Sequence, residues 1–182
     1  MKKIILSAIA IFTIGFANAQ ENSIKVNPLS FFGGNDLVSF EHKLGDSGSL
    51  ALGLGFSSLS VDNSTYSNIG AELQYRFYFE EALKGWYAGP NVGFTSGKVK
   101  TDYSGYGFSS SSSSYEDKYT RLQIGARGGY QWIFGSGFTL DLNLGFAYNN
   151  IKYSNESSTA NGSDLKVSGI FPNFGLGLGY SF

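Results

Sequence analysis

Large apolar residues alternate one for one with small or polar residues in seven stretches of this chain, and the C-terminal stretch shows the pattern most clearly. Between Ile170 and Phe182, one set of alternate residues is apolar or aromatic, and the other set, from Asn173 to Ser181, is small and rich in glycine. Successive side chains of a β-strand point to opposite faces. The stretch therefore predicts a long strand with one apolar face and one face of almost no side-chain volume.

Together with a weaker stretch near the N-terminus, these patterns predict eight strands. They cover residues 23–31, 37–44, 50–57, 69–79, 86–95, 121–132, 138–148 and 170–182. Three short connections have the composition of hairpin turns: residues 45–48, 80–85 and 135–137. The connections at the other end of the strands are longer and polar, at residues 59–68, 100–117 and 149–166, except for the short first one at residues 33–36. This alternation of short turns and longer loops is typical of an outer-membrane barrel.

The orientation of the apolar face decides the class of protein. The interior of an eight-stranded barrel is only just wide enough for side chains to fill, so it cannot hold the many Phe, Tyr, Leu and Trp residues of that face. A soluble barrel that buries the apolar face is the alternative, and this packing argument disfavours it. We therefore predict an all-β fold, an eight-stranded antiparallel up-and-down transmembrane β-barrel with its apolar face toward lipid. Aromatic residues gather near both ends of the strands, as expected where an apolar band meets water.

The first residues are typical of a secretory signal peptide. Lys2 and Lys3 precede an apolar run from Ile4 to Phe16, and Ala17-Asn18-Ala19 supplies small residues at the expected cleavage position. A transmembrane helix is the alternative, but a helix that spans a bilayer needs about 20 apolar residues. We expect residues 1–19 to be removed and residues 20–182 to form one barrel domain.

Composition narrows the chemistry. The formal net charge of −1 includes no basic surplus, which argues against nucleic acid as a partner. The chain has no cysteine, so it has neither disulfides nor thiolate chemistry, and its single histidine leaves only carboxylates as metal ligands. We expect no cofactor and no metal site. The 25 glycines and the aromatic fraction of 16% suit an all-β chain.

The signal peptide, the eight alternating strands, the longer loops at one end and the terminal Tyr180-Ser181-Phe182 resemble the small eight-stranded outer-membrane barrels of the OmpX and OmpA transmembrane-domain type. The resemblance implies a monomer in the bacterial outer membrane, with outer-membrane lipids and the barrel-assembly machinery as partners. An aromatic C-terminus preceded by alternating apolar residues resembles the signal that this machinery reads. The residues that match it are Phe174, Leu176, Leu178, Tyr180 and Phe182.

Charged residues on the glycine-rich face predict a polar network in the lumen. Its members are Glu41, Glu72, Arg76, Arg127 and Asp141. Glu72 and Arg127 share one depth in their strands, and Arg76 and Asp141 share another, so each pair is expected to meet across the lumen. Buried charges must be paired or hydrated. A plug that satisfies itself is favoured because an eight-stranded interior is normally filled, and a gate or a proton path is the alternative.

Three prolines fall inside the predicted strands, although a closed barrel has no edge to shelter them. They are Pro28, Pro90 and Pro172. We expect bulges there, or strands that end earlier than the pattern indicates. If the first and last strands close the barrel, Pro28 and Pro172 weaken the seam between them.

Two further features bear on function. His42 falls on the apolar face and is expected to be an interfacial polar residue, with a role as general base in a lipid hydrolase as the alternative. The loop that begins at Thr101 is rich in Tyr, Ser and Gly, a composition found in adaptable binding surfaces, but composition alone favours a solvated loop. Its binding candidates are Tyr103, Tyr106, Phe108 and Tyr115.

These observations favour a protein that is not an enzyme. We predict a bacterial outer-membrane barrel that anchors surface-exposed loops for adhesion, ligand interaction or envelope integrity. A narrow channel for small solutes is the second hypothesis, because the glycines of the inner face would leave room for water. A lipid-modifying barrel enzyme built on His42 is the third.

Overall fold

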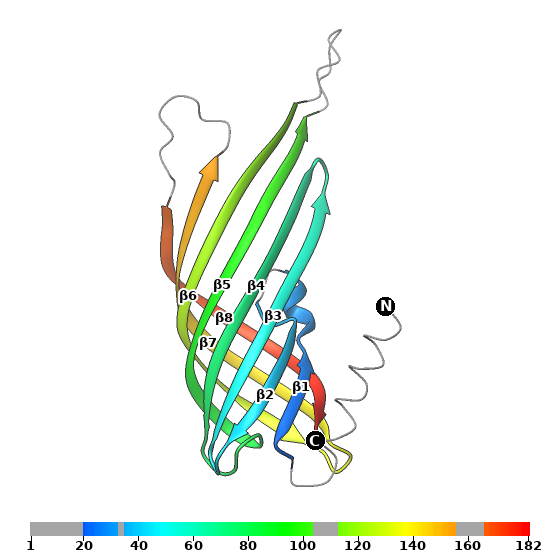
Figure 1. Cartoon of the computed structure of the whole chain (residues 1–182), viewed down its shortest axis with the longest axis vertical. Helices are drawn as coiled ribbons and strands as arrows, with labels where there is room; N and C mark the ends of the chain where they lie inside the picture. Colours follow the sequence, from blue (N-terminus) through cyan, green and yellow to red (C-terminus); the bar gives the residue numbers. More distant parts are fainter. Residues whose placement is uncertain (1–19, 33–34, 104–112, 156–165) are drawn as a thin grey trace, which may run out of the picture.

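A computed structural model describes residues 20–32, 35–103, 113–155 and 166–182, which form a closed antiparallel barrel of eight strands and one short 3-10 helix (Figure 1). Each strand pairs with its neighbours in the sequence, and β1 pairs with β8. The elements are β1 (Asn22–Val26), η1 (Pro28–Phe32), β2 (Val38–Leu44), β3 (Gly48–Val61), β4 (Ser64–Tyr78), β5 (Gly85–Tyr103), β6 (Ser113–Ile133), β7 (Phe138–Asn155) and β8 (Lys166–Ser181). The predicted fold is confirmed. The expected signal peptide lies outside the described residues.

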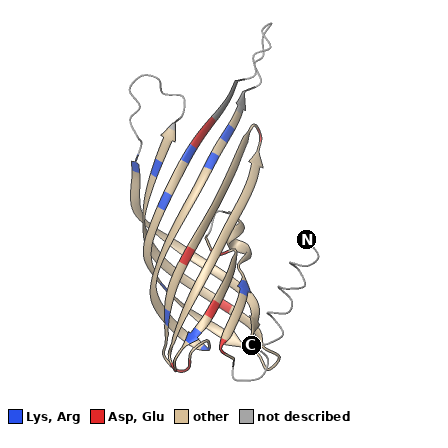
Figure 2. Ribbon diagram, viewed as in Figure 1, with Lys and Arg blue, Asp and Glu red and all other residues tan. Residues whose placement is uncertain are grey.

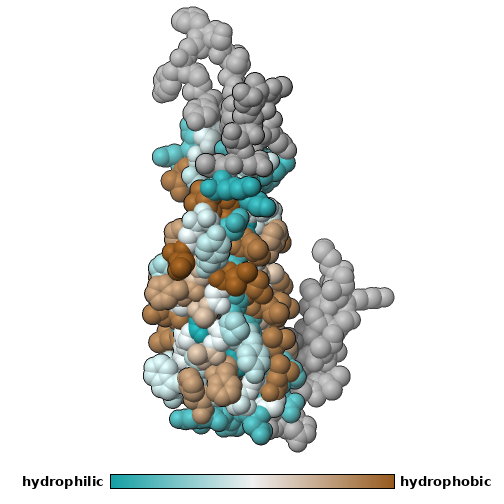
Figure 3. Space-filling model, turned by 90° about the vertical axis from the view of Figure 1, so that its left-hand side faces the viewer, coloured by the Kyte–Doolittle hydropathy of each residue, from teal (hydrophilic) through white to brown (hydrophobic). Residues whose placement is uncertain are grey.

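The barrel is apolar outside and polar inside, as the alternating pattern predicts. Among the described residues, six apolar side chains are buried against twenty polar or charged ones. Phe56 and Phe146, on opposite sides of the barrel, are both 60% exposed. Figure 3 shows the result on one face, where hydrophobic residues cover the middle of the molecule and hydrophilic residues lie toward both ends. In the described part of the chain, no helix is long and apolar enough to cross a membrane.

The longer connections are shorter than the sequence pattern predicts, because the strands continue beyond the apolar band. The predicted loop 59–68 is wrong: β3 and β4 pair as far as Val61 and Ser64 and leave a turn at Asp62 and Asn63. Hydroxyl pairs replace apolar contacts across this hairpin, with Ser60 Oγ and Thr65 Oγ1 3.0 Å apart. Strands β5 to β8 extend into the other two predicted loops in the same way.

The first predicted strand, residues 23–31, is also wrong in its second half. β1 ends at Val26, and η1 begins at Pro28. The side-chain oxygen of Asn27 accepts a hydrogen bond from Leu29 N at 3.2 Å, which is the role of a helix cap. A proline in the first turn of a helix costs no hydrogen bond, because the amides there have no partner within the helix. Pro28 therefore ends the strand instead of forming a bulge.

The short β1 and β2 leave the wall of the barrel incomplete on one side. β2 pairs with β3 only as far as Leu54, and β1 pairs with β8 only as far as Leu178, although β3 and β8 continue. We call the space between residues 55–61 of β3 and residues 166–177 of β8 the lateral gap; within the described residues, neither edge has a strand partner there. η1 contacts both β3 and β8 and stands in the lower part of the lateral gap (Figure 1).

The lateral gap accounts for Pro172, which lies on the free edge of β8, where a missing amide hydrogen is tolerated. Asn27 also contributes at this edge, because its side-chain oxygen accepts a hydrogen bond from Leu176 N at 3.3 Å. Pro90 differs. The pairing of β4 with β5 keeps one register on both sides of Pro90, from Gln74–Asn91 to Phe77–Ala88, so the predicted bulge is absent there.

The backbone geometry of the turn between β6 and β7 can be tested by substitution of a glycine. Gly137 has a φ of +87°, and an added Cβ would lie 2.7 Å from the Ser181 carbonyl oxygen. Because a left-handed backbone costs an L-residue about 1–2 kcal/mol, Gly137→Ala should lower the free energy of unfolding by at least that amount. Urea denaturation of the refolded barrel, followed by circular dichroism, measures the loss. Gly135→Ala is the control, since its Cβ meets open space, and equal losses in both variants would contradict the turn geometry.

Candidate functional site in the barrel interior

Four charged side chains from four strands meet near the end of the barrel that carries the short turns. We call Lys25 of β1, Glu41 of β2, Arg76 of β4 and Asp141 of β7 the lower cluster. Lys25 Nζ lies 2.5 Å from Glu41 and 3.0 Å from Asp141, and Arg76 Nη1 lies 3.1 Å and 2.6 Å from the same two carboxylates. All four side chains are buried. Each cation bridges both anions, so the lower cluster is neutral and fully cross-linked.

Neutral side chains satisfy the remaining polar atoms of the lower cluster. The Tyr78 hydroxyl donates to Glu41 at 2.8 Å, and the Tyr87 hydroxyl donates to Asp141 at 2.7 Å. The side-chain oxygen of Gln131 accepts from Lys25 at 2.5 Å and from Arg76 at 3.2 Å. The Arg76 guanidinium also lies 4.3 Å from the centre of the Tyr87 ring. Such complete pairing is what makes buried charge tolerable.

The connection between β4 and β5 closes the barrel beneath the lower cluster. Leu83 is fully buried, and its carbonyl accepts a hydrogen bond from Gln131 Nε2 at 2.7 Å. The backbone of Leu83 is left-handed, with a φ of 73°, which turns this side chain inward. Ala82 N donates to the Asp46 carbonyl at 2.8 Å and ties the connection to the neighbouring turn. The sequence pattern predicts only a hairpin turn at residues 80–85 and does not indicate this role.

A second group of charges lies above the lower cluster. We call Asp36, Glu72 and Arg127 the upper cluster. Arg127 Nη1 and Nη2 each lie 2.9 Å from one carboxylate, Asp36 and Glu72 respectively. Asp36 belongs to the segment between η1 and β2, and its carboxylate also accepts a hydrogen bond from the Ser30 hydroxyl.

The glycines of the inner face make room for inserted side chains. A Cβ on Gly53 would lie 2.8 Å from Asp36 Cβ, and a Cβ on Gly93 would lie 2.7 Å from Asn35 Nδ2. A Cβ on Gly177 would lie 3.3 Å from the Lys25 side chain. These glycines therefore do not line an open passage in this part of the barrel, because the space above them is occupied.

The structure places all five residues of the predicted lumen network inside the barrel, where they are buried. Both expected pairs are in contact: Arg76 with Asp141, and Glu72 with Arg127. Figure 2 shows acidic and basic residues next to one another within the lower half of the barrel. Sequence reasoning missed Asp36, since a residue in a connection has no strand parity. The predicted network also does not include Lys25, which lies at the centre of the lower cluster.

The other candidates lie apart from this interior. Phe174, Leu178 and Tyr180 point outward and are exposed, and Leu176 and Phe182 are partly exposed. Their role in assembly stays a prediction. Tyr103 ends β5, and Tyr115 lies in β6 opposite Thr101, while Tyr106 and Phe108 lie outside the described residues.

His42 lies on the exposed outer face, where its Nδ1 is 2.8 Å from the side-chain oxygen of Asn22. In the described segments, no three His, Cys, Asp or Glu side chains are arranged to hold a metal ion.

These features define a class of protein, a closed eight-stranded barrel with an apolar exterior and an interior that contains ion-paired charges. The chain belongs to the family described as "Protein of unknown function (DUF3575)", whose family model matches residues 4–168. No curated protein and no solved structure matches it.

The lower cluster can be tested by removing one charge. Arg76→Met leaves Glu41 and Asp141 with Lys25 as the one remaining cation of the lower cluster. Removing one partner from a buried ion pair costs about 3–5 kcal/mol, so the midpoint of urea unfolding should fall strongly. Lys100→Met is the matched control. It removes an exposed cation 3.3 Å from Glu116, and an exposed pair contributes less than about 1 kcal/mol. A loss that small in Arg76→Met would refute the role of the lower cluster.

Proposed function

We propose that this protein is an integral barrel of the bacterial outer membrane that holds polar hairpins and loops at the cell surface and has no catalytic role. The observation that carries the proposal is the inverted distribution of polarity: large apolar residues are exposed on the outside, whereas most of the buried residues among those described are polar or charged. Water would penalise such a surface heavily, because each square ångström of exposed apolar area costs roughly 25 cal/mol. Hydrocarbon removes this cost, and the paired strands satisfy the backbone there.

The ends of the apolar surface support a position across a bilayer. Trp86 and Trp132 are exposed near the short turns, and Trp86 packs edge-on against Tyr130 with 5.1 Å between ring centres. Exposed Phe94 and Tyr148 lie toward the opposite end. Such aromatic belts mark the two boundaries between hydrocarbon and water. Beyond the second belt, several lysines lie on the long strands (Figure 2), where the surface is hydrophilic.

The filled interior favours an anchor over the two alternative functions. A channel needs a continuous aqueous path, but the Leu83 connection and the lower cluster occupy the end of the barrel with the short turns. A lipid-modifying enzyme based on His42 needs a nucleophile beside the ring, whereas the ring contact that the structure gives is with Asn22. The resemblance to OmpX-type barrels leads us to expect the short turns in the periplasm and the long hairpins outside the cell. It also implies the barrel-assembly machinery as the partner that reads the C-terminal strand.

The membrane position can be tested with two arginine variants on β7. Leu142 points outward near the middle of the apolar band, so Leu142→Arg should lower stability in a lipid bilayer by about 2–4 kcal/mol. Asn150 points outward on the same strand beyond the band, and Asn150→Arg should change stability by less than about 1 kcal/mol. Equilibrium unfolding in liposomes measures both. If the two variants are equally stable, the assignment of the apolar band to lipid is wrong.

The surface role can be tested by deleting residues 104–112 and joining Tyr103 to Ser113 through Asn-Gly. Strands β5 and β6 already pair at this point, and shortening a loop changes its closure entropy by only about 0.6 kcal/mol per halving. The barrel should therefore still migrate faster on gels before boiling than after it. Adherence of expressing cells to mucin-coated and fibronectin-coated surfaces should fall to the level of cells without the protein. Deletion of residues 156–165 is the control for the effect of shortening any loop. If deletion of residues 104–112 leaves adherence unchanged, this loop has no part in the proposed surface role.

A further inference from the structure

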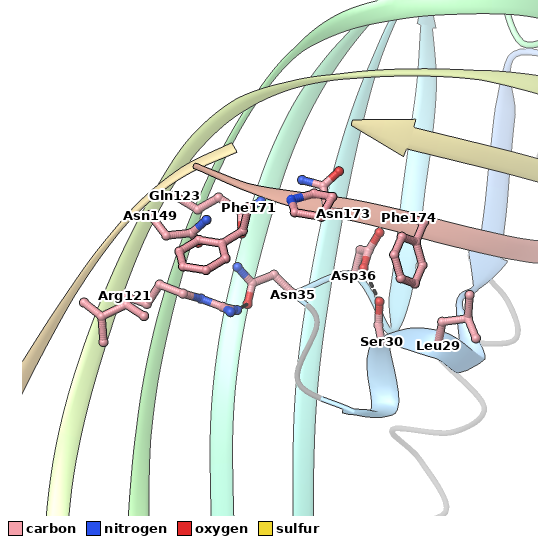
Figure 4. Close-up of a pocket in the computed structure, with 12 residues that line it drawn as sticks. Leu29, Ser30, Asn35, Asp36, Arg121, Gln123, Asn149, Phe171, Asn173 and Phe174 are labelled. Carbon is pink, nitrogen blue, oxygen red and sulfur yellow. Dashed lines mark hydrogen bonds between the residues drawn. The ribbon is translucent and has the colours of Figure 1, made fainter. Parts of the chain in front are cut away.

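A cavity of about 440 Å³ lies above the upper cluster, beside the lateral gap. Its size falls within the range of small-molecule sites, roughly 300–1,000 Å³. Figure 4 shows Arg121 and Asn35 at one end of the cavity and Leu29 and Phe174 at the other. Its lining also includes Gln123 and Asn149 from the inner face. The end at Arg121 and Asn35 is the polar end, although Phe171 lies there too. Leu29 and Phe174 form the other end together with Ser30 and Asp36.

The cavity crosses the wall of the barrel. Arg121, Gln123 and Asn149 belong to the inner face, whereas Leu29 and Phe174 are exposed outside. Residues of both faces can line one cavity here because β1 and β2 do not extend into the lateral gap. The opening therefore leads sideways from the interior to the surface that we propose to be in contact with lipid.

The mouth of the cavity lies within the apolar band. On β8, Phe174 is 66% exposed and Ile170 is 72% exposed, and on η1, Leu29 is 43% exposed. Phe171 and Ile151 also line the cavity and add apolar surface. By the alternation of their strands they belong to the inner face, where polar residues are expected. A hydrocarbon chain from the outer half of the bilayer would contact the exposed side chains of Leu29 and Phe174 at this mouth.

The polar end of the cavity presents hydrogen-bond donors without acceptors. Asn35 Nδ2 and Asn173 Nδ2 are buried and have no hydrogen-bond partner, and Asn35 is only 3% exposed. Their oxygens are already used: Asn35 Oδ1 accepts from Thr95 at 2.7 Å and Asn173 Oδ1 accepts from Arg127 at 3.2 Å. Arg121 adds its guanidinium, which donates to Thr95 and to Asn35. A ligand for this end must therefore supply acceptor oxygens.

We propose that the cavity binds a long-chain fatty acid, which reaches it through the lateral gap. The carboxylate accepts hydrogen bonds from Asn35 and Asn173 and lies near Arg121, and the hydrocarbon chain passes between Leu29 and Phe174 into the bilayer. A carboxylate fits better than a phosphate, because Asp36 also lines the cavity and would repel a second negative charge. The lateral route rests on the proposed membrane function, whereas the binding site itself does not.

Native mass spectrometry of the refolded barrel, released from detergent, can count bound ligands and rank their affinities. The probes are palmitate, hexadecanol and hexadecyl phosphate, which share a chain and differ in the headgroup. We expect one palmitate per barrel, with hexadecanol and hexadecyl phosphate each bound at least about tenfold more weakly. Hexadecanol lacks the charge that strengthens hydrogen bonds, and Asp36 repels the second negative charge of hexadecyl phosphate. Equal or tighter binding of hexadecanol or of hexadecyl phosphate would overturn the proposed carboxylate site.

Three variants locate the site. Ile151→Trp fills the cavity and should abolish the single palmitate, whereas Ile69→Trp, on the outer face of β4, should retain it. Arg121→Gln keeps a hydrogen-bonding side chain and should reduce palmitate binding to the level of hexadecanol. The shift in gel migration on boiling confirms that each variant is folded. Retention of palmitate by Ile151→Trp, or its loss from Ile69→Trp, would contradict binding in this cavity.

Flotation of the wild-type protein with liposomes separates the two proposals. A barrel that binds one palmitate but does not float with liposomes would overturn the membrane position and the lateral route, and it would leave the cavity site standing. A barrel that floats but binds no palmitate would overturn the cavity site alone.

Discussion

The lower cluster is the interaction on which the rest of the barrel depends. β1 and β2 have only 5 and 7 residues, so their backbone ladders hold them weakly compared with the long hairpins. Lys25 and Glu41 fasten these two strands to Arg76 of β4 and Asp141 of β7, across the interior. Each bond is short and buried, where charge–charge attraction is screened little. The lower cluster thereby holds β1 and β2 in the barrel, and these two strands do not need long backbone ladders.

The need to pair buried charge shapes the inner face. Each cation of the two clusters lies against carboxylates, and glycines stand where inserted side chains need volume, as at Gly53 beneath Asp36. The segment from η1 to β2 then fills the upper interior with Asn35 and Asp36 instead of continuing the wall. The incomplete wall and the filled interior are therefore two effects of the same short strands.

Strand periodicity was sufficient to predict the fold class, the outward apolar face and the depths of Arg76 and Asp141, because each follows from alternation and from the width of the barrel. Strand periodicity failed where a strand contains few large apolar residues and where a connection folds into the barrel. The upper part of the β3–β4 hairpin is held by Ser and Thr hydroxyls, so its composition resembles that of a loop. Asp36 and Leu83 lie in connections that fold inward, and such a path depends on what the finished barrel has room for. Pro28 was recognised as an obstacle to a strand, but the pattern gave no sign of the helix that replaces it.

The seam between β1 and β8 has a consequence for the order of assembly. Seven of the eight interfaces join strands that follow one another in the chain. In each of these, pairing can begin at the connection between the two strands and extend along them. The eighth joins the two ends of the chain through only four residue pairs, compared with nineteen between β5 and β6. Because joining distant segments carries the largest entropic cost, the curved sheet forms before the seam does. Until the seam forms, β1 and β8 are open edges with which a strand of another sheet can pair. Because the seam is short, only a few backbone hydrogen bonds have to be exchanged when such a strand leaves and the barrel closes.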